Sequence, residues 1–199
     1  MPVSPRIVTG WHSVAYNRLD RKFRSMEIYD AVRNRIELKT YSDEPVDSDT
    51  KRTILDAGRL ASSGRNRQPW EFVVLDDQAD LDALADVSPS GKWIANADFA
   101  VAICTDTSHE DLRDYDHIVD AGRAVTQMQL VAWEQGVASR IYTIDQPDAE
   151  RLLELPAEYD LTIVAGFGYP DREIKGIKDR KELNEVASSG SFGADLELD

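Results

Sequence analysis

Apolar residues recur along this chain with two different periods, and the order of these periods predicts the fold. Segments with apolar residues three or four positions apart are predicted to be helices, and short continuous apolar runs are predicted to be strands. The helical segments are Met26 to Asn34, Thr50 to Ala61, Ala79 to Val87, Asp116 to Gln135, and a last one from Pro147 to about Leu155. The strand-like runs are Glu71 to Leu75, Phe99 to Cys104, Ile141 to Ile144 and Leu161 to Phe167.

Helices and strands therefore alternate through most of the chain, which predicts an α/β or α+β fold. We expect a small sheet covered by helices. Asp47 or Ser48 can cap the helix that follows, and Gly136 is a natural end for the longest helix. The run from Phe99 to Cys104 shows no polar alternation, which predicts a strand buried on both faces.

The composition indicates one domain with a strongly acidic surface. The 199 residues are enough to bury a sizeable core. The 37 Asp and Glu residues outnumber the 23 Lys and Arg residues, which gives a net charge of −14. Such a surface disfavours nucleic acid and anionic membranes, and no apolar run reaches the roughly 18 residues that would span a membrane. We therefore expect neither a nucleic-acid partner nor a membrane partner.

Metal and disulfide chemistry are not indicated either. The single cysteine, Cys104, excludes an internal disulfide and a multi-cysteine metal site. Because it lies in an apolar run, we expect a buried structural thiol. The three histidines show no metal-ligand spacing, so no metal site is predicted.

Residues 1–25 differ from the rest of the chain, because they carry five basic side chains and one acidic side chain. The segment has a net charge of +4, which leaves −18 for the remainder. It has no hydrophobic periodicity, which fits a poorly ordered arm, a partner-binding arm, or an upstream start with Met26 as the usual first residue. We favour the poorly ordered arm, with residues 26–199 forming a single domain. The segment also lacks the apolar core of a secretory signal, so we expect a cytoplasmic protein.

The densest group of polar side chains lies between residues 62 and 72, after a predicted helix and before a predicted strand. It contains two hydroxyls, two arginines, Asn66 and Gln68. Asn and Gln present donors and acceptors in a fixed geometry, which suits the edge of a heterocycle. Loops on a rigid scaffold are also where binding groups concentrate. From these residues alone, a solvated polar loop with an aromatic anchor explains the pattern equally well.

Two short basic clusters could hold a phosphate in this acidic protein, namely Arg35 with Lys39 and Lys178 with Arg180. Arg offers paired N–H groups to phosphate oxygens, and Lys adds a point charge. The alternative is that each cluster is a solvated surface. A main-chain phosphate loop is not indicated, because the sequence has no G-x-x-x-x-G-K-[ST] pattern and no G-x-G-x-x-G fingerprint before a helix.

The polar stretch carries a resemblance to a known family. At this spacing, Ser62-Ser63-Gly64, Asn66, Gln68-Pro69-Trp70 and Phe72 resemble the central motif of the nitroreductase family of flavoproteins. The resemblance extends over most of the chain, from about Met26 to about Val186. It implies a nitroreductase-like fold with a small mixed or antiparallel sheet, an intertwined homodimer with shared flavin sites, and FMN as the cofactor.

The same resemblance assigns phosphate-binding roles to the basic clusters. Arg35 resembles the arginine that binds the flavin phosphate, and Lys39 resembles the basic residue beside the flavin pyrimidine. Lys178 and Arg180 resemble a late Lys-x-Arg phosphate clamp. Glu37 stands where the family usually has Ser. Because an acid near a phosphate is unfavourable, we expect the Glu37 side chain to turn away or to pair with an arginine.

Two further stretches acquire roles from the resemblance. The residues Ser62, Ser63, Asn66 and Gln68 resemble the loop that reaches the flavin from the partner subunit. The residues Ile141, Tyr142 and Thr143 occupy the stretch that backs the isoalloxazine and can present a backbone N–H to its N5. In the homodimer, the helix from Asp116 to Gln135 is the candidate interface, with Val125, Met128 and Ala132 predicted at its core.

The activity implied by the resemblance is two-electron transfer by a ping-pong mechanism. NADH or NADPH would give a hydride to the flavin, and a nitroaromatic, quinone or similar acceptor would then be reduced. No side chain is assigned as a catalytic acid or base. Two alternatives remain open, namely a specialised reaction on the same fold, such as dehydrogenation or flavin breakdown, and a flavin-binding or sensory protein without turnover.

Overall fold

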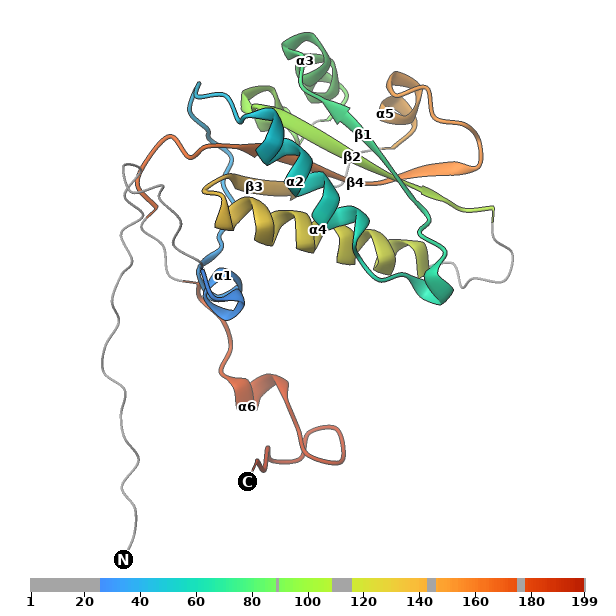
Figure 1. Ribbon diagram of the computed structural model, residues 1–199. Helices are drawn as coiled ribbons and strands as arrows, with labels where there is room; N and C mark the ends of the chain where they lie inside the picture. The colour runs from blue at the N-terminus through green and yellow to red at the C-terminus, as the bar shows by residue number, and fades with distance from the viewer. Residues whose placement is uncertain (1–25, 89, 109–115, 143–145, 175–177, 199) are drawn as a thin grey trace, which may run out of the picture.

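The computed structural model describes residues 26–88, 90–108, 116–142, 146–174 and 178–198, which form a layered body and a projecting C-terminal arm (Figure 1). Each predicted helix and strand is present. The helices are α1 (Ile28–Asn34), α2 (Ser48–Arg59), α3 (Gln78–Asp86), α4 (Asp116–Glu134), α5 (Gln146–Leu152) and α6 (Leu183–Val186). The strands are β1 (Trp70–Leu75), β2 (Phe99–Asp106), β3 (Ala138–Tyr142) and β4 (Tyr159–Gly168), and the 3-10 turns are η1 (Gly64–Asn66) and η2 (Lys92–Asn96).

The four strands form one antiparallel sheet in the order β1-β2-β4-β3. This confirms the expectation of a small mixed or antiparallel sheet. Strand β2 is buried along almost its whole length, as its continuous apolar run predicted. Strand β3 begins at Ala138, three residues before the predicted start at Ile141. The sequence did not indicate this earlier start, because the polar residues Ser139 and Arg140 interrupt the apolar run, although Ser139 is buried. A parallel bridge from Glu37 to Ser139 continues the sheet beyond β3.

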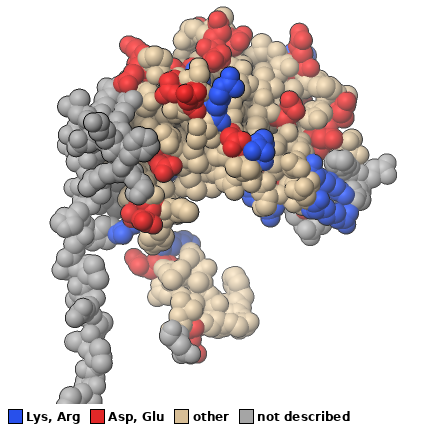
Figure 2. Space-filling view, viewed as in Figure 1, with Lys and Arg blue, Asp and Glu red and all other residues tan. Residues whose placement is uncertain are grey.

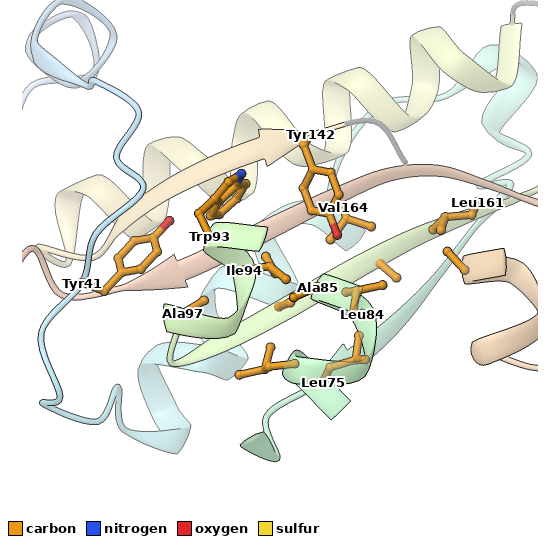
Figure 3. Packing of buried hydrophobic residues seen from close by; sticks show 14 of the residues in the cluster. Tyr41, Leu75, Leu84, Ala85, Trp93, Ile94, Ala97, Tyr142, Leu161 and Val164 are labelled. Carbon is orange, nitrogen blue, oxygen red and sulfur yellow. The ribbon is translucent and has the colours of Figure 1, made fainter. Parts of the chain in front are cut away.

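Helices cover both faces of the sheet, so the body has three layers (Figure 1). On one face, α2 and α4 pack over a core that includes Ile54, Phe99 and Phe167. The Phe99 and Phe167 rings stack with their centroids 4.9 Å apart. On the other face, α3, η2 and α5 enclose a second core around Leu84 and Trp93, which Figure 3 shows. Burial of these side chains is the main stabilising contribution, at about 1.5–3 kcal/mol for each large apolar residue.

The ends of two helices follow the predicted signals. The Asp47 carboxylate accepts the Thr50 N–H at 2.9 Å and also the Thr50 hydroxyl at 2.9 Å, which caps α2. These hydrogen bonds from Thr50 lower the pKa of Asp47. Gly136 follows α4 with a φ of 78°, a left-handed conformation that favours glycine at a helix C-terminus.

The long helix α4 corrects one prediction. Val125, Met128 and Ala132 were expected at a dimer interface, but they are buried within the chain's own core. They lie on the helix face that packs against α2 and the sheet, because residues three or four apart share one helix face. A contact with another subunit must therefore use the opposite face of α4. Val119, on that face, is 45% exposed.

The C-terminal arm, residues 178–198, leaves the body beside α1 and carries α6 (Figure 1). Its apolar side chains Leu183, Val186 and Phe192 are largely exposed. The arm nevertheless has internal order, because Ser189 binds the main chain of Glu197 through two hydrogen bonds. Solvated apolar side chains on an ordered segment are typical of a surface that another molecule covers.

Charged side chains are unevenly distributed over the surface. Figure 2 shows acidic side chains around α3, and basic side chains gathered at the end of the body where the loop of residues 62–68 lies. In the described residues, no helix combines the length and the apolar character needed to cross a membrane. The predicted arm of residues 1–25 and the predicted site residue Thr143 lie outside the described residues.

The contact between α2 and α4 yields a prediction about Gly58. A Cβ atom at Gly58 would overlap the methyl end of Met128. We expect Gly58→Ala to lower the free energy of unfolding by about 1–3 kcal/mol, the usual cost of overpacking a core. In a Met128→Ala background the clash is gone, so Gly58→Ala should be neutral or stabilising by up to about 1 kcal/mol through helix propensity.

Chemical denaturation of the wild type, both single variants and the double variant measures this coupling. The Met128→Ala variant is the reference, because it alone should cost about 2–5 kcal/mol by leaving a cavity. An equal cost of Gly58→Ala in both backgrounds would show that α2 and α4 do not meet at these residues.

Candidate functional site

The two predicted basic clusters come together where the C-terminal arm leaves the body. Arg35 directly follows α1, and its side chain is only 20% exposed. The Lys178 ammonium group donates a hydrogen bond to the Val32 carbonyl, although these residues are 146 positions apart in the chain. Arg180 lies close enough for its charge to act on Lys178. We call Arg35, Lys178 and Arg180 the cationic cluster.

The charges of the cationic cluster act on one another. Partial burial lowers the pKa of Lys178, and the positive charges of Arg35 and Arg180 lower it further. Like charges at short range disfavour each other, so the cluster is electrostatically strained without an anion. Within the described residues, the buried Nη1 of Arg35 has no hydrogen-bond partner. The Glu37 Oε1 atom lies 3.7 Å from Arg35 Nη1, which is longer than a hydrogen bond.

These features test whether a phosphate group would fit the cluster. A phosphate carries about two negative charges and three acceptor oxygens. The cluster offers three cationic donors from two segments, one of them an arginine with a buried and unpartnered N–H group. Charge and donor count therefore match a phosphate monoester.

Lys39 lies on a firmly anchored segment beside the cluster. Leu38 N–H donates to the Ser139 carbonyl at 3.3 Å, which holds the segment along β3. The Tyr41 hydroxyl donates to the Leu38 carbonyl at 2.9 Å and lies 3.3 Å from the Gly166 carbonyl. Burial raises the pKa of Tyr41, so the hydroxyl remains a donor. Leu38 and Tyr41 face inward while Lys39 is exposed.

Two of the three residues predicted at β3, Ile141 and Tyr142, direct their backbone groups to opposite sides of the strand. In an antiparallel strand, successive residues direct their N–H and C=O groups to opposite sides. The Ser139 carbonyl binds Leu38 on the outer side, so Ile141 also directs its N–H to that outer side. Tyr142 directs its backbone toward β4, and its ring packs edge-on against Trp93 at 5.4 Å. Burial raises the pKa of Tyr142 to about 12, and Figure 3 shows its ring within the core.

The loop of residues 62–68 has a strained backbone. Arg65, Asn66 and Gln68 have φ values of 52°, 58° and 53°, a left-handed region that residues other than glycine seldom adopt. Ser63 holds this conformation, because its hydroxyl accepts the Gln68 N–H at 2.9 Å and its carbonyl accepts the Asn66 N–H at 3.0 Å. Strained conformations of this kind concentrate at functional sites. The loop thus presents the exposed Asn66 and Gln68 side chains in a fixed arrangement.

Asp120 on α4 anchors the loop, a role that was not predicted from the sequence. Its carboxylate accepts the Gly64 N–H at 3.0 Å and the Arg123 guanidinium at 2.8 Å. Asp120 itself is only 2% exposed. One signal in the sequence could have indicated this role, namely an acidic residue next to Ala121 on the apolar face of the long helix. A carboxylate buried there requires hydrogen-bond partners from another segment.

An open groove lies between the loop and the outer face of α4. It has a volume of about 470 Å³ and is lined by Ser62, Val119, Gly122, Arg123, Thr126 and Gln127. Most of these residues come from the face of α4 that points away from the core. The groove therefore lies on the outward face of α4, away from the core.

The loop and the cationic cluster lie at opposite ends of α4 (Figure 1). The loop is bound at Asp120, near the start of the helix. The cluster adjoins the segment that bridges to Ser139, just past the helix end at Glu134. With a rise of 1.5 Å per residue, Asp120 and Glu134 are about 20 Å apart along the axis. The structure brings Arg35, Lys178 and Arg180 together, but it keeps Asn66 and Gln68 away from them.

Comparisons with known proteins agree with this fold and motif. Residues 32–90 match the model of the Nitroreductase family. A curated protein of Methanothermobacter thermautotrophicus, with the provisional name NADH dehydrogenase/NAD(P)H nitroreductase, is 26% identical over 176 residues, or 86% of this chain and 91% of that protein.

Two solved structures share the fold at a similar level of identity. An FMN-dependent nitroreductase from Clostridium difficile superposes with a TM-score of 0.74 at 26% identity, over 81% of this chain and 98% of that chain. A provisionally named nitroreductase from Desulfovibrio desulfuricans, crystallised in complex with FMN, gives a TM-score of 0.73 at 26% identity, over 85% and 99% of the two chains. The family model, the curated relative and the shared fold confirm the resemblance to the nitroreductase family.

The anchoring role of Asp120 can be tested by removing its carboxylate. Asp120→Ala leaves the Gly64 N–H without its acceptor, so we expect hydrogen exchange at Gly64 to be at least about ten-fold faster. This corresponds to the 1.5–3 kcal/mol typical of a hydrogen bond to a charged group. Mass-spectrometric exchange over the loop measures the effect. Thr126→Ala is the control, because Thr126 lines the same groove but its hydroxyl donates to the Gly122 carbonyl within α4. Unchanged exchange in Asp120→Ala would contradict the role.

Proposed function

We propose that this chain is an FMN-dependent oxidoreductase that uses NADH or NADPH to reduce a nitroaromatic, quinone or similar acceptor. The observation that carries the proposal is the convergence of Arg35, Lys178 and Arg180 around an unpartnered arginine N–H group. The names of similar proteins support the choice of FMN and NAD(P)H.

Within this proposal, each feature of the site has a separate role. The cationic cluster holds the phosphate group of FMN. Lys39, exposed on its anchored segment, supplies a positive charge beside the flavin pyrimidine. The Ile141 N–H, on the outer edge of β3, is the candidate donor toward the flavin ring. Bound FMN would supply the hydride-transfer chemistry, and the protein supplies orientation and charge.

No side chain is assigned a proton-transfer role. Tyr41 and Tyr142 are buried, and burial raises the pKa of each hydroxyl, so neither would act as a base near neutral pH. Burial likewise raises the pKa of the Cys104 thiol to about 12, which keeps it protonated and a poor nucleophile. The residues described above therefore bind and orient, which is what flavin-dependent hydride transfer requires of the protein.

The proposed assembly is a homodimer in which α4 meets its own copy across a two-fold axis. An antiparallel pair of α4 helices places the start of one helix beside the end of the other. The loop of one chain, bound at Asp120, then comes close to the cationic cluster of the partner chain. The groove at Gly122 and Thr126 and the exposed apolar arm with Phe192 provide surfaces for such an interface.

Turnover is tested by combining purified protein and FMN with NADH or NADPH and a quinone or nitroaromatic acceptor. An oxidation rate of NAD(P)H that requires both FMN and the acceptor supports the oxidoreductase. FMN binding without such a rate would instead favour a flavin-binding protein without turnover.

The phosphate role of the cationic cluster gives a quantitative prediction for Arg180→Ala. Loss of one charge-assisted contact should weaken FMN binding by about ten-fold or more, equivalent to roughly 1.5–3 kcal/mol. Fluorescence titration at a fixed, stated salt concentration measures it, since exposed charges are screened. Lys181→Ala is the matched control, because it removes an adjacent exposed positive charge that is not part of the cationic cluster.

Riboflavin provides an internal control for this prediction, because it lacks the phosphate. Its affinity should be nearly the same in the wild type and in Arg180→Ala. An equal affinity of Arg180→Ala and wild type for FMN would refute the phosphate assignment.

A further inference from the structure

Glu37 holds a negative charge inside the proposed phosphate site. Its Oε1 lies 3.7 Å from Arg35 Nη1, and its side chain is only 32% exposed. The bridge between Glu37 and Ser139 fixes its backbone against the sheet. The pKa of Tyr41 is raised mainly by burial. The charge of Arg140 lowers this pKa, and the charge of Glu37 raises it. Of the two expected arrangements, the side chain pairs with an arginine and does not turn away.

The Glu37–Arg35 pair compensates charge but does not provide Arg35 with a hydrogen-bond acceptor. At 3.7 Å, Glu37 and Arg35 attract each other, but the distance is too long for a hydrogen bond. Arg35 Nη1 therefore keeps an N–H group without a hydrogen-bond partner among the described residues. The carboxylate compensates part of the positive charge of Arg35 and leaves the donor of Arg35 open to a ligand.

We propose that Glu37 is a built-in competitor for the phosphate group, which stabilises the empty site and weakens phosphate binding. This inference rests on the proposed function, because it takes the cationic cluster as the FMN phosphate site. Three positive charges and the charge of Glu37 give the site a net charge of two positive units, close to the charge that a phosphate monoester neutralises.

The competition follows from simple electrostatics. A phosphate that accepts a hydrogen bond from Arg35 Nη1 must come within a few ångströms of the Glu37 carboxylate. The two negative groups then repel each other in a partly buried setting, where solvent screens them less than in bulk water. The phosphate can therefore reach the open Arg35 donor only against the repulsion of the nearby carboxylate. Such a site retains FMN less tightly and exchanges it more readily than the same cluster without the acid.

The test is the isosteric substitution Glu37→Gln, which removes the charge and keeps the shape. FMN affinity should rise by about ten-fold, while riboflavin affinity stays within about two-fold of the wild type. The melting temperature of the flavin-free protein should fall, because the cationic cluster loses its counter-ion. A merely structural role of Glu37 would move stability and FMN affinity in the same direction. Glu158→Gln removes an exposed acid from the residue just before β4 and is the charge-matched control.

Each outcome decides the proposal. An unchanged or weaker FMN affinity in Glu37→Gln would overturn it, and a weaker affinity would show instead that Glu37 positions Arg35 for the phosphate. If Glu37→Gln is too unstable to titrate, Glu37→Ser removes the same charge and is subject to the same criterion.

Inorganic phosphate separates this proposal from the proposed function. If the wild type does not bind FMN, the FMN assignment fails. The shift in melting temperature between sodium phosphate and sodium chloride of equal ionic strength still compares Glu37→Gln with the wild type. A larger phosphate-dependent shift in Glu37→Gln would support competition by Glu37, and an equal or smaller shift would overturn it.

Discussion

Mutual repulsion among Arg35, Lys178 and Arg180 is the constraint on which the site depends. These like charges come from chain segments more than 140 positions apart, and folding brings them together at a free-energy cost. The costs are reduced by a hydrogen bond from Lys178 to the Val32 carbonyl and by the Glu37 carboxylate. Neither interaction provides Arg35 Nη1 with a hydrogen-bond partner. An anionic ligand resolves both the repulsion and the unpartnered donor, which is why the cluster is interpreted as a phosphate site.

The sheet and α4 decide where the other parts of the site can lie. Strand β3 holds the Arg35–Tyr41 segment along its outer edge through the Leu38–Ser139 hydrogen bond, so the Ile141 N–H and the cluster share one side of the molecule. Asp120 holds the strained loop at the far end of α4, about 20 Å away along the helix. In the proposed flavin site, one chain therefore carries both halves without joining them. A two-fold pairing of α4 is the simplest arrangement that joins them.

The sequence predicted the elements well because their signals are local. Helix periodicity, the Asp47 cap, Gly136 and the uninterrupted apolar run of β2 each report on neighbouring residues. The basic clusters were also recognised, but their convergence depends on tertiary contacts between distant segments. The face of α4 that would contact a partner was predicted wrongly. The sequence of an amphipathic helix shows which residues are apolar, but it does not show whether they pack against the same chain or against another chain. Asp120 was overlooked because a buried carboxylate gains meaning only from the loop that it binds.

A mixed dimer tests most directly whether two chains share one flavin site. One chain would carry Arg35→Ala and Arg180→Ala, and the other would carry Asn66→Ala and Gln68→Ala, with different affinity tags for purifying the mixed species. Sharing across the dimer places all four substitutions in one site and leaves the other intact, so tight FMN binding should reach about half of the wild-type amount per dimer. Each variant paired with itself should lose both tight sites. Two equally impaired sites in the mixed dimer would contradict the account, because loop and cluster would then act within one chain.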